Sequence, residues 1–495
     1  MLSATEIRRF IEDDITSEKK RLAAVGMNYY EGKHDILKSR FFYYTADGEF
    51  VEDKTRSNVK ISHPFFTILT DQLAAFILSS KENPIRAKEK VEGLQDHLDS
   101  YFNAAFWAEI SELIKGAYSK GFEYLYGYKN AENRMSFRCA DSMGVVEVRE
   151  KDTDDGCAYI IYWYIDRIDK GKKVIKRIQV WSEKEIYFFV QAGNGKIQID
   201  DSAKVNPRPH VVFTDEKTGK RMGYPLGFIP FLRLDNNKKQ LSGLNPIKGI
   251  IDDYDVHACS LSNNLIDFDT PLHVIRGFQG DNLDELQQNL KTKKLIGVDE
   301  EGGVEVQTVD IPYQARKEKL NMDKEDIFFF GMGFDPTQVG DGNITNIVIR
   351  SRYSMLELKA NNTIPRLKTM LDEVVKTVLA EINQENDTDF KLSDIEYCFT
   401  PEIMTNETEN IANEKVKAET KQIEVNTILN VAANIGDEAT LKEICEVLDL
   451  DFEELKGQVE KMQEEQNTAD AKAMLEGVVT DEPQTEDSSA AVFAE

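Results

Sequence analysis

The hydrophobic pattern of residues 331–383 predicts a polar, glycine-rich loop, GMGFDPTQVGDGNITN, followed by one long helix. That helix would have about 38 residues and a length of about 57 Å. Its interior contains Pro365, which has no N–H to donate to the carbonyl of Asn361, so we expect a kink there. Apolar side chains recur at the helical period of three or four residues or twice that, at Ile349, Tyr353, Leu356, Ile364, Leu367, Leu371, Val374, Val378 and Ile382.

A second helical pattern covers residues 245–271, from Asn245-Pro246 to Thr270-Pro271. A short insert, residues 272–310, follows with the pattern strand, helix, strand, strand, and residues 311–330 are again helical. Two helices that flank an insert predict an antiparallel helix pair with a small module at its tip. The predicted apolar stripe of the first helix consists of Ile247, Ile250, Tyr254, Ala258, Leu261, Leu265 and Phe268.

The part of the chain before these helices changes period once. Residues 3–24 predict an amphipathic helix, Ser62-His63-Pro64 predicts a helix start, and residues 92–127 predict more helix. Between residues 135 and 234, short segments rich in β-branched and aromatic side chains predict strands, with a hairpin turn at Asn194-Gly195. Because strands and helices do not alternate, the predicted fold class is α+β, which disfavours a doubly wound nucleotide-binding sheet.

The C-terminal part is predicted to be helical and then disordered. The chain has little pattern from residue 384 to Pro401, and residues 405–476 show helical patterns with charged faces. From Asp451 to Glu495 there are 13 acidic and 3 basic residues, a net charge of −10. Such a segment cannot bury enough apolar surface to fold alone, so we expect disorder in residues 477–495.

Composition restricts the function classes. The 495 residues carry a net charge of −27, which repels DNA over long range and argues against tight wrapping of nucleic acid, although DNA could still pass loosely through a channel. Five scattered cysteines without a CxxC motif indicate a reducing compartment. We see no secretory signal pattern and no run near the ~18 apolar residues of a membrane span, so no membrane partner is expected.

The sequence contains no GxxxxGK[ST], GxSxG or HExxH motif and no zinc-ligand spacing, so we predict no catalytic residue, cofactor or metal. One cluster of acidic residues allows an alternative, catalytic function. It consists of Asp252, Asp253 and Asp255, with His257 beside them. Asp252, Asp255 and His257 could serve a metal-dependent nuclease if further carboxylates converged on them. The interpretation we favour is a solvated helix face opposite the apolar stripe.

The basic residues gather near the insert and the loop, and each alone is most simply ordinary surface charge. As a group they would weaken the repulsion between an acidic channel and a phosphate backbone. The loop with Gly340 and Gly342 is either a plain flexible connection or a contact loop. The basic residues concerned are Arg276, Lys291, Lys293 and Lys294 in the insert, Arg316, Lys317 and Lys319 on the helix after it, and Arg350 and Arg352 after the loop.

Two long segments resemble the portal proteins of tailed bacteriophages with long flexible tails: GFIPFLRLDNNKKQLSGLNPIKGIIDDYD, residues 227–255, and GMGFDPTQVGDGNITNIVIRSRYSMLELKA, residues 331–360. The segments NYYEGKHDI and KISHPFFTILTDQLAAFILS also fit that family. The resemblance covers about residues 1–385 in order. Ser242-Gly243-Leu244 departs from the family pattern, in which an acidic residue follows the serine.

The resemblance implies a portal fold with long stem helices, a mixed α/β wing, a small α/β clip and a helical crown. Transferred by position, the clip surface would use Arg276, Lys291, Lys293 and Lys294. The loop residues facing DNA would be Asp335, Thr337, Gln338, Asp341, Asn343 and Thr345, and the basic residues facing the channel would be Arg316, Lys317, Lys319 and Arg350. The implied divisions are wing 1–244, stem helix 245–271, clip 272–310, stem helix 311–331, tunnel loop 332–346, kinked helix returning to the wing 347–399, crown 400–476 and tail 477–495.

The same resemblance implies a function and partners. A ring, usually of about twelve subunits, would sit at one capsid vertex of the virion after assembly in the bacterial cytoplasm. Double-stranded DNA would pass non-specifically through its channel during packaging and ejection. The terminase large subunit, a head–tail adaptor protein, and the major capsid and scaffold proteins would bind it. The alternatives are the nuclease described above and a structural adaptor without a channel.

Overall fold

The computed structural model describes residues 1–457 except 55, 81, 90, 92, 131, 150–155, 170, 172, 215–220, 268–271, 279–297, 308–311, 339–345, 402–406, 449, 451, 453 and 454. These residues fall into two compact units, each considered by itself. The first comprises the described residues up to 342 and those from 347 to 403. The second comprises those from 404 onward together with 343–346.

The N-terminus forms two helices, α1 (Ala4–Thr16) and α2 (Glu18–Tyr30), so the single helix predicted for residues 3–24 is wrong. Ser17 separates them, because its backbone is extended and its side chain accepts a hydrogen bond from the N–H of Lys20. Serine competes with the helix in this way wherever its hydroxyl can cap a new first turn.

The segment after α2 contains η1 (Asp35–Lys38) and the strands β1 (Phe42–Tyr44) and β2 (Phe50–Glu52), which pair with each other. Helix α3 (Phe65–Ile77) begins after Pro64, as predicted. Next come β3 (Ile85–Ala87), α4 (Leu94–Tyr101) and α5 (Ala104–Lys120). The helix predicted for residues 92–127 is therefore wrong after Lys120. Gly121, with φ +96°, ends α5 in the left-handed conformation that glycine adopts readily.

The predicted β-rich region is confirmed and consists of antiparallel sheets. One sheet has the order β14–β4–β5, and a larger one has the order β10–β9–β8–β7–β6 with β11 pairing to β9. The predicted hairpin at Asn194-Gly195 joins β9 to β10. The strands are β4 (Phe122–Lys129), β5 (Met135–Ala140), β6 (Val145–Val148), β7 (Tyr159–Asp169), β8 (Lys173–Trp181), β9 (Glu185–Ala192), β10 (Ile197–Ile199), β11 (Arg208–Pro209), β12 (Val211–Thr214), β13 (Arg221–Tyr224) and β14 (Phe231–Asp235), with η2 (Ser142–Gly144) before β6.

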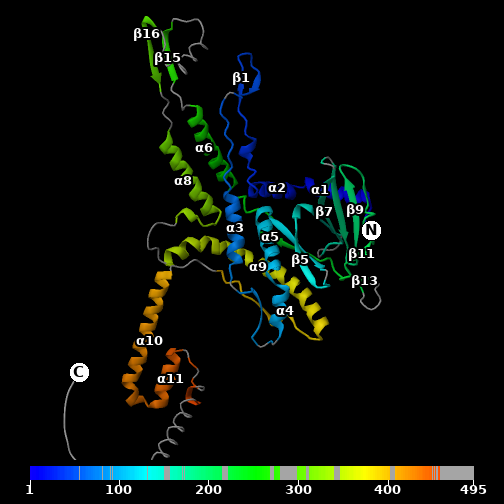
Figure 1. The fold of residues 1–495 in the computed structure, drawn as a ribbon, viewed down its shortest axis with the longest axis vertical. Coiled ribbons are helices and arrows are strands. Elements are labelled where there is room, and N and C mark those ends of the chain that lie inside the picture. Colours follow the sequence, from blue (N-terminus) through cyan, green and yellow to red (C-terminus); the bar gives the residue numbers. More distant parts are fainter. Residues whose placement is uncertain are drawn as a thin grey trace, which may run out of the picture. The chain divides into compact units, whose positions relative to one another are not determined.

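The two helices around the insert are α6 (Lys248–Asp267) and α8 (Tyr313–Phe330), and they lie side by side (Figure 1). Between them β15 (Leu272–Phe278) and β16 (Val298–Gln307) form an antiparallel hairpin at the far end of the pair. The antiparallel pair with a module at its tip is thus confirmed. The helix predicted inside the insert lies outside the described residues.

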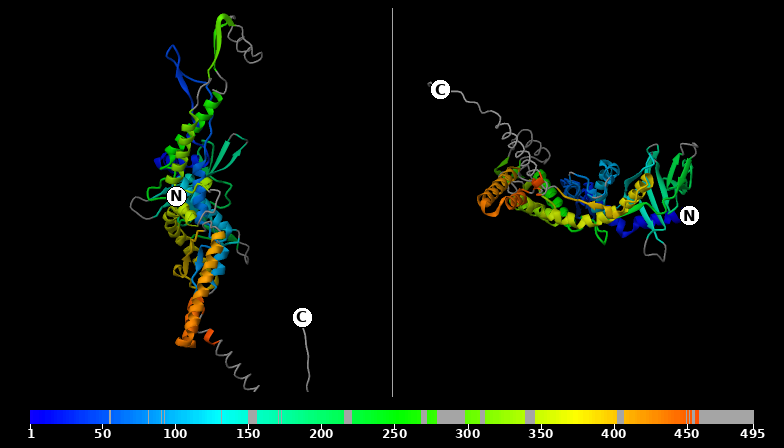
Figure 2. Two further views of the ribbon diagram at one scale, coloured as in Figure 1. Left: turned by 90° about the vertical axis from the view of Figure 1, so that its left-hand side faces the viewer. Right: turned by 90° about the horizontal axis from the view of Figure 1, so that it is seen from below.

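The long predicted helix is confirmed as α9 (Asn346–Asn386), 41 residues with Pro365 inside. Figures 1 and 2 show it as one helix with a curved path. Its apolar face forms the centre of the main core with residues of α3 and α5, and Leu367, Leu371, Val374 and Val378 are fully buried. After it, the short helix η4 (Leu392–Asp394) leads to β17 (Ile395–Tyr397), which pairs with β3.

The second unit contains α10 (Glu407–Ile435) and α11 (Asp437–Leu448), which pack together. These helices agree with the helical pattern predicted from residue 405. The disorder predicted for residues 477–495 lies outside the described residues. Among the described helices, none is both long enough and apolar enough to cross a bilayer.

Candidate functional site: helices α6 and α8 and the loop between α8 and α9

One face of α6 holds an extended segment, residues 57–63, through four side chains. Helix positions four residues apart rise about 6 Å, and strand positions two residues apart advance about 6.6 Å, so the two repeats match. Each backbone N–H that faces the helix therefore meets an acceptor. The pairs are Ser57 N with Asp267 Oδ1 (3.3 Å), Val59 N with Asn263 Oδ1 (2.7 Å), Ile61 N with Cys259 Sγ (3.3 Å) and His63 N with Asp255 Oδ1 (3.0 Å).

Asp255 is the most buried member of this series, with no exposed side-chain surface. Its Oδ2 lies 2.6 Å from Nδ1 of His34 and its Oδ1 lies 2.7 Å from Nδ1 of His63. Burial opposes the charge, but these hydrogen bonds outweigh it and lower the pKa of Asp255. The interpretation of this acidic group as a solvated face is therefore wrong for Asp255.

The apolar stripe predicted for α6 is also only partly correct. Ile247 is buried, but Leu265 is 52% exposed, and the buried face continues instead through Asp255, Cys259 and Asn263. The reason is the extended segment, because its N–H groups require polar acceptors on the helix face they cover.

The nuclease alternative finds no assembled site among the described residues. The carboxylate of Asp252 accepts hydrogen bonds from the hydroxyl of Tyr29 and from Nζ of Lys248 (2.7 Å). Among the described residues, the ion-pair partner of His257 is Asp253, at 3.5 Å. In the part of the chain that the structure describes, no group of three or more His, Cys, Asp or Glu side chains is placed to hold a metal ion.

Polar contacts join α6 to α8. Lys319 binds the carboxylates of Asp253 on α6 and of Asp323 on its own helix. Arg316 Nη1 donates to Ser260 Oγ at 3.2 Å. Two of the four basic residues predicted to face a channel thus hold the helix pair together, whereas Lys317 and Arg350 are exposed.

The start of the predicted tunnel loop is packed tightly onto α3. A Cβ on Gly333 would lie 2.1 Å from Cδ2 of Leu69, and one on Gly331 would lie 2.6 Å from Cδ1 of the same residue, so a larger side chain at either position would force Leu69 to move. The backbone of Phe334 exchanges two hydrogen bonds with the amide of Gln72. Its ring stacks on Tyr353 of α9 with centroids 4.6 Å apart. This glycine-dependent contact anchors the loop between α3 and α9.

Asp335, the first predicted DNA-facing residue, is turned inward. Its carboxylate pairs with Nζ of Lys324 at 2.9 Å and accepts hydrogen bonds from the N–H and hydroxyl of Thr337, which open η3 (Pro336–Gln338). These contacts lower the pKa of Asp335 against the opposing effect of burial. Thr337 is exposed. The side chains of the remaining predicted loop residues, Gln338, Asp341, Asn343 and Thr345, lie outside the described set.

Lys359, in the first half of α9, is buried against this anchor and was missed by the sequence analysis. Its Nζ donates to the carbonyls of Gly331 (3.0 Å) and Leu69 (3.3 Å) and lies 4.1 Å from the ring centroid of Tyr118. Burial lowers the pKa of Lys359 to about 7. The only sequence signal was a lysine in phase with the apolar residues of the helix, three positions after Leu356.

The other predicted residues are placed as follows. Pro365 is exposed, and its carbonyl accepts a hydrogen bond from Thr369 Oγ1 at 3.0 Å. Arg276 is exposed on β15, and its guanidinium lies 3.6 Å from Glu305 of β16. Lys291, Lys293 and Lys294 lie outside the described residues.

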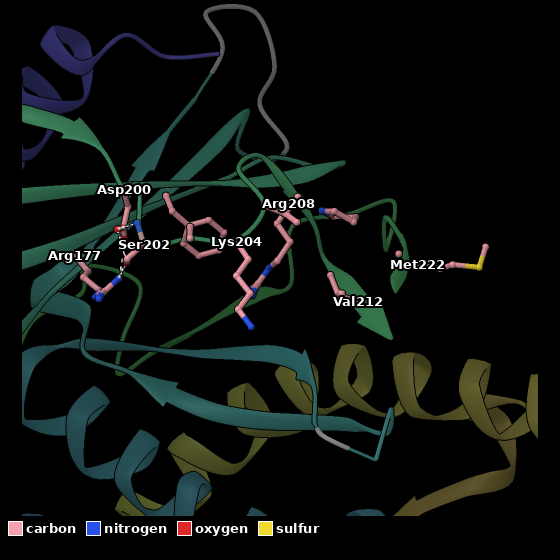
Figure 3. A pocket seen from close by; sticks show the side chains of 12 residues that line it. Arg177, Asp200, Ser202, Lys204, Arg208, Val212 and Met222 are labelled. Carbon is pink, nitrogen blue, oxygen red and sulfur yellow. Dashed lines mark hydrogen bonds and ion pairs between the residues drawn. The ribbon is translucent and has the colours of Figure 1, made fainter. Parts of the chain in front are cut away.

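A separate cavity of about 360 Å³ lies in the β-rich region (Figure 3). Arg177 binds Asp200 and Ser202 at one end, and the side chains of Lys204, Arg208, Val212 and Met222 line the rest. None of these residues was predicted to be functional, and within the lining the hydroxyl of Ser202 donates to Asp200 Oδ1 at 2.6 Å.

These features define an α+β protein in which a helix pair carries a hairpin at one end and meets an anchored loop at the other. The family model described as phage portal protein, SPP1 Gp6-like, matches residues 8–472, and the chain belongs to that family of phage portal proteins. The resemblance inferred from the two sequence segments is therefore confirmed.

Two curated relatives are both described as portal proteins. The chain is 25% identical over 339 residues to that of Bacillus phage SPP1, covering 68% of this chain and 65% of the relative, slightly less than two thirds of its length. It is 24% identical over 436 residues to that of Clostridium phage phiCD119, covering 82% of this chain and 87% of the relative.

Proposed function

We propose that about twelve copies of this chain form a closed ring around a channel through which double-stranded DNA enters and leaves a phage capsid. The helices α6 and α8 run along the channel as its stem. The observation that supports this best is the packed α6–α8 pair, which carries the β15–β16 hairpin at one end and reaches the anchored loop at the other.

The charge distribution suits a channel that does not bind DNA tightly. The net charge of −27 repels a phosphate backbone, which lowers non-specific affinity. Exposed Lys317 and Arg350 moderate that repulsion locally, whereas Arg316 and Lys319 mainly hold the stem helices together. DNA therefore slides past the wall, and the chain itself catalyses no reaction.

The loop of residues 332–346 narrows the channel and contacts DNA through Thr337, Gln338, Asp341, Asn343 and Thr345. Its fixed end is the contact of Gly331 and Gly333 with α3, and its other end continues directly into α9. Bending of α9 near Pro365 couples the loop to the core. Asp335 stabilises the fixed end, since its carboxylate is held by Lys324 and Thr337.

The remaining divisions take the roles implied by position. Residues 272–310 form a clip that binds the terminase large subunit and later a head–tail adaptor, with Arg276, Lys291, Lys293 and Lys294 on the contact surface. Residues 1–244 form the wing and residues 400–476 the crown, which meet the major capsid and scaffold proteins. The ring assembles in the bacterial cytoplasm and remains at one vertex of the virion.

Electron microscopy of the purified full-length chain tests the proposal directly. We expect rings with an axial hole wide enough for a DNA duplex. Particles without a hole favour an adaptor without a channel, and a strictly monomeric chain at high concentration contradicts the proposal. Hydrolysis of ATP by the chain alone, or metal-dependent cleavage of DNA that is lost in Asp252→Ala, contradicts the absence of catalysis.

A further inference from the structure

The cavity in the β-rich region lies where the larger sheet meets the β12–β13 hairpin (Figure 3). Its volume of about 360 Å³ is within the range of ligand-binding pockets. The lining comes from β8, β9 and β11, from the turn of residues 200–205, and from both strands of the hairpin. Sheet and hairpin approach closely, because a Cβ on Gly223 of β13 would lie 2.5 Å from Cγ of Pro209 in β11.

The walls of the cavity are held in place by contacts that need no ligand. Oδ1 of Asp200 accepts hydrogen bonds from the N–H (3.0 Å) and the hydroxyl (2.6 Å) of Ser202, and its Oδ2 pairs with the guanidinium of Arg177. The side-chain amide of Asn206 exchanges two hydrogen bonds with the backbone of Phe188 in β9. A cavity with such fixed walls pays little ordering entropy when a ligand binds, which favours affinity.

Part of the lining is apolar and partly exposed. Phe188 and Val212 are half-buried, whereas Val205 is 46% exposed and Met222 is 52% exposed. Pockets for small molecules enclose most of the ligand surface, and a rim with two half-exposed apolar side chains does not. A protein segment can fill the cavity and cover this rim at the same time, so the shape favours a protein ligand.

The charged side chains of the lining are mostly basic, although the chain as a whole carries −27. The described lining contains the cations Arg177, Lys204 and Arg208 and one carboxylate, that of Asp200. Arg177 is neutralised, because its guanidinium pairs with Asp200 and lies 3.2 Å from the carboxylate of Asp166. The cavity is therefore a locally positive place on an acidic protein.

Lys204 is the cation best placed to meet a ligand. Its side chain is exposed, and its ammonium forms no hydrogen bond or ion pair with any residue that the structure describes. The apolar wall is close to it, since Phe188, over whose ring Arg208 is stacked at 4.7 Å, belongs to the same lining. An exposed ammonium beside an apolar hollow attracts a carboxylate that is itself next to an apolar group.

We propose that this cavity binds an acidic segment of another protein. An aromatic or aliphatic side chain of the segment enters against Phe188 and Val212, and a neighbouring carboxylate pairs with Lys204. The net negative charge of the chain repels acidic partners elsewhere on its surface, so the pairing with Lys204 also sets the position of the segment. All lining residues belong to one copy, so the inference goes beyond the proposed function and does not depend on ring formation.

The first test selects ligands for the immobilised full-length chain from a library of random peptides, after the library has been depleted on the variant Lys204→Glu. We expect the enriched peptides to carry aspartate or glutamate next to an aromatic or aliphatic residue. Failure to enrich any peptide overturns the proposal, and so does enrichment of basic or uncharged peptides.

The second test measures binding of the most enriched peptide, with a fluorescent label, by anisotropy. Lys204→Glu should weaken binding at least about tenfold, because it places like charges together. Val205→Ser with Met222→Ser should weaken it about tenfold through lost apolar contact. The matched controls are Lys184→Glu and Ile168→Ser, exposed residues outside the cavity, which should bind as the wild type does. Unchanged binding in the cavity variants, or equal losses in the controls, overturns the proposal.

A third test locates the bound peptide. Its apolar residue is replaced by benzoylphenylalanine, the complex is irradiated, and the attachment site is identified by mass spectrometry. We expect attachment to fragments that contain Phe188, Val212 or Met222. Attachment to any other part of the chain places the peptide outside the cavity and contradicts the proposal.

Competition separates the possible occupants. If inorganic phosphate or a DNA duplex displaces the labelled peptide as well as unlabelled peptide does at equal ionic strength, the cavity takes anions of any kind. If the enriched peptides match a segment of this chain, the occupant is a second copy. Either result overturns the proposal. Rings that form although no peptide binds leave the proposed function standing.

Discussion

The side-chain amino group of Lys359 donates a hydrogen bond to the backbone carbonyl of Gly331 at 3.0 Å. This contact joins the first half of α9 to the residue that ends α8, 28 positions earlier in the chain. Because Gly331 begins the glycine-dependent anchor on α3, one buried amino group links α8, the loop and α9. A movement of the loop that displaces Gly331 must break the bond or move α9.

Lys359→Met should remove a pH dependence of stability. The pKa of Lys359 is about 7 in the folded protein and about 10.5 when unfolded, so between these values only the unfolded chain holds the proton. The stability of the wild type should therefore rise with pH across this window, by up to about 1.4 kcal/mol per pH unit from this residue.

Thermal unfolding of the wild type and of Lys359→Met at pH 7, 8 and 9 measures the effect. The stability of the wild type relative to the variant should rise steadily with pH. The control is Lys376→Met on the same helix, whose exposed ammonium pairs with Glu373. Because the pKa of Lys376 is raised, it stays charged throughout this range and its substitution should not alter the slope. Parallel curves for wild type and Lys359→Met would contradict the assignment.

Gly333→Ala should loosen the loop anchor, because the added Cβ would lie 2.1 Å from Leu69. We expect a loss of about 1–3 kcal/mol in unfolding free energy, the usual effect of overpacking. Hydrogen exchange of the Phe334 amide, which is bonded to Gln72, should become faster.

Gly249→Ala is the matched control for that substitution, since a Cβ on Gly249 in α6 meets no atom within 4 Å. Because alanine favours the helical conformation more than glycine does, this substitution in the first turn of α6 should stabilise the protein by up to about 0.5–1 kcal/mol. Glycine-to-alanine substitution should thus lower the unfolding free energy at Gly333 and raise it at Gly249. Equal effects would mean that Gly333 is not tightly packed in solution.

Asp255→Asn should weaken the attachment of residues 57–63 to α6. The substitution removes the buried charge and one of the two acceptor oxygens that bind His34 and His63, and such losses cost about 3–5 kcal/mol. Because the pKa of Asp255 is lower in the folded than in the unfolded protein, its contribution is complete above the unfolded value of 3.8 and is lost as the pH falls through the folded value.

Urea unfolding at pH 7 and pH 3 measures both effects. Asp253→Asn provides the comparison on the same helix, where a partly exposed pair with Lys319 should contribute about 0–1 kcal/mol. If the two substitutions destabilise equally at pH 7, Asp255 is not the principal attachment of residues 57–63 to α6.

Pro365→Ala should change DNA packaging more than ring assembly. Alanine restores an N–H that can donate to the carbonyl of Asn361 and removes the ring that crowds that turn, so α9 should become straighter and stiffer. Packaging of DNA by reconstituted capsids is the measurement, with ring formation by electron microscopy as the control. Unchanged packaging with intact rings would remove the support for bending near this residue.

Local patterns predicted the elements well where each element depends on its own residues. The α9 period from Leu356 to Ile382, the α6–α8 pair around a module and the hairpin at Asn194-Gly195 all follow from spacing and turn chemistry. The end of α5 was missed, although Gly121 before an aromatic segment is a recognisable stop signal.

The candidate site was less predictable, because its main residues act through partners distant in sequence. Asp255 was assigned to a solvated face, but His34 and His63 lie 221 and 192 positions away. Lys359 belonged to no motif, since its acceptors are the backbone carbonyls of Leu69 in α3 and of Gly331 directly after α8. Asp335 was expected, from the resemblance, to face DNA, whereas its carboxylate is buried against Lys324 and Thr337.

The family, the α+β class and the main helices could be assigned from the sequence, since these depend on motifs and on apolar periods of a few residues. Which face of α6 is buried and where the loop is anchored became clear only from the folded structure. A hydrophobic period reports which side chains avoid water, but it does not report that a distant backbone segment will present unpaired N–H groups to Asp255, Cys259 and Asn263.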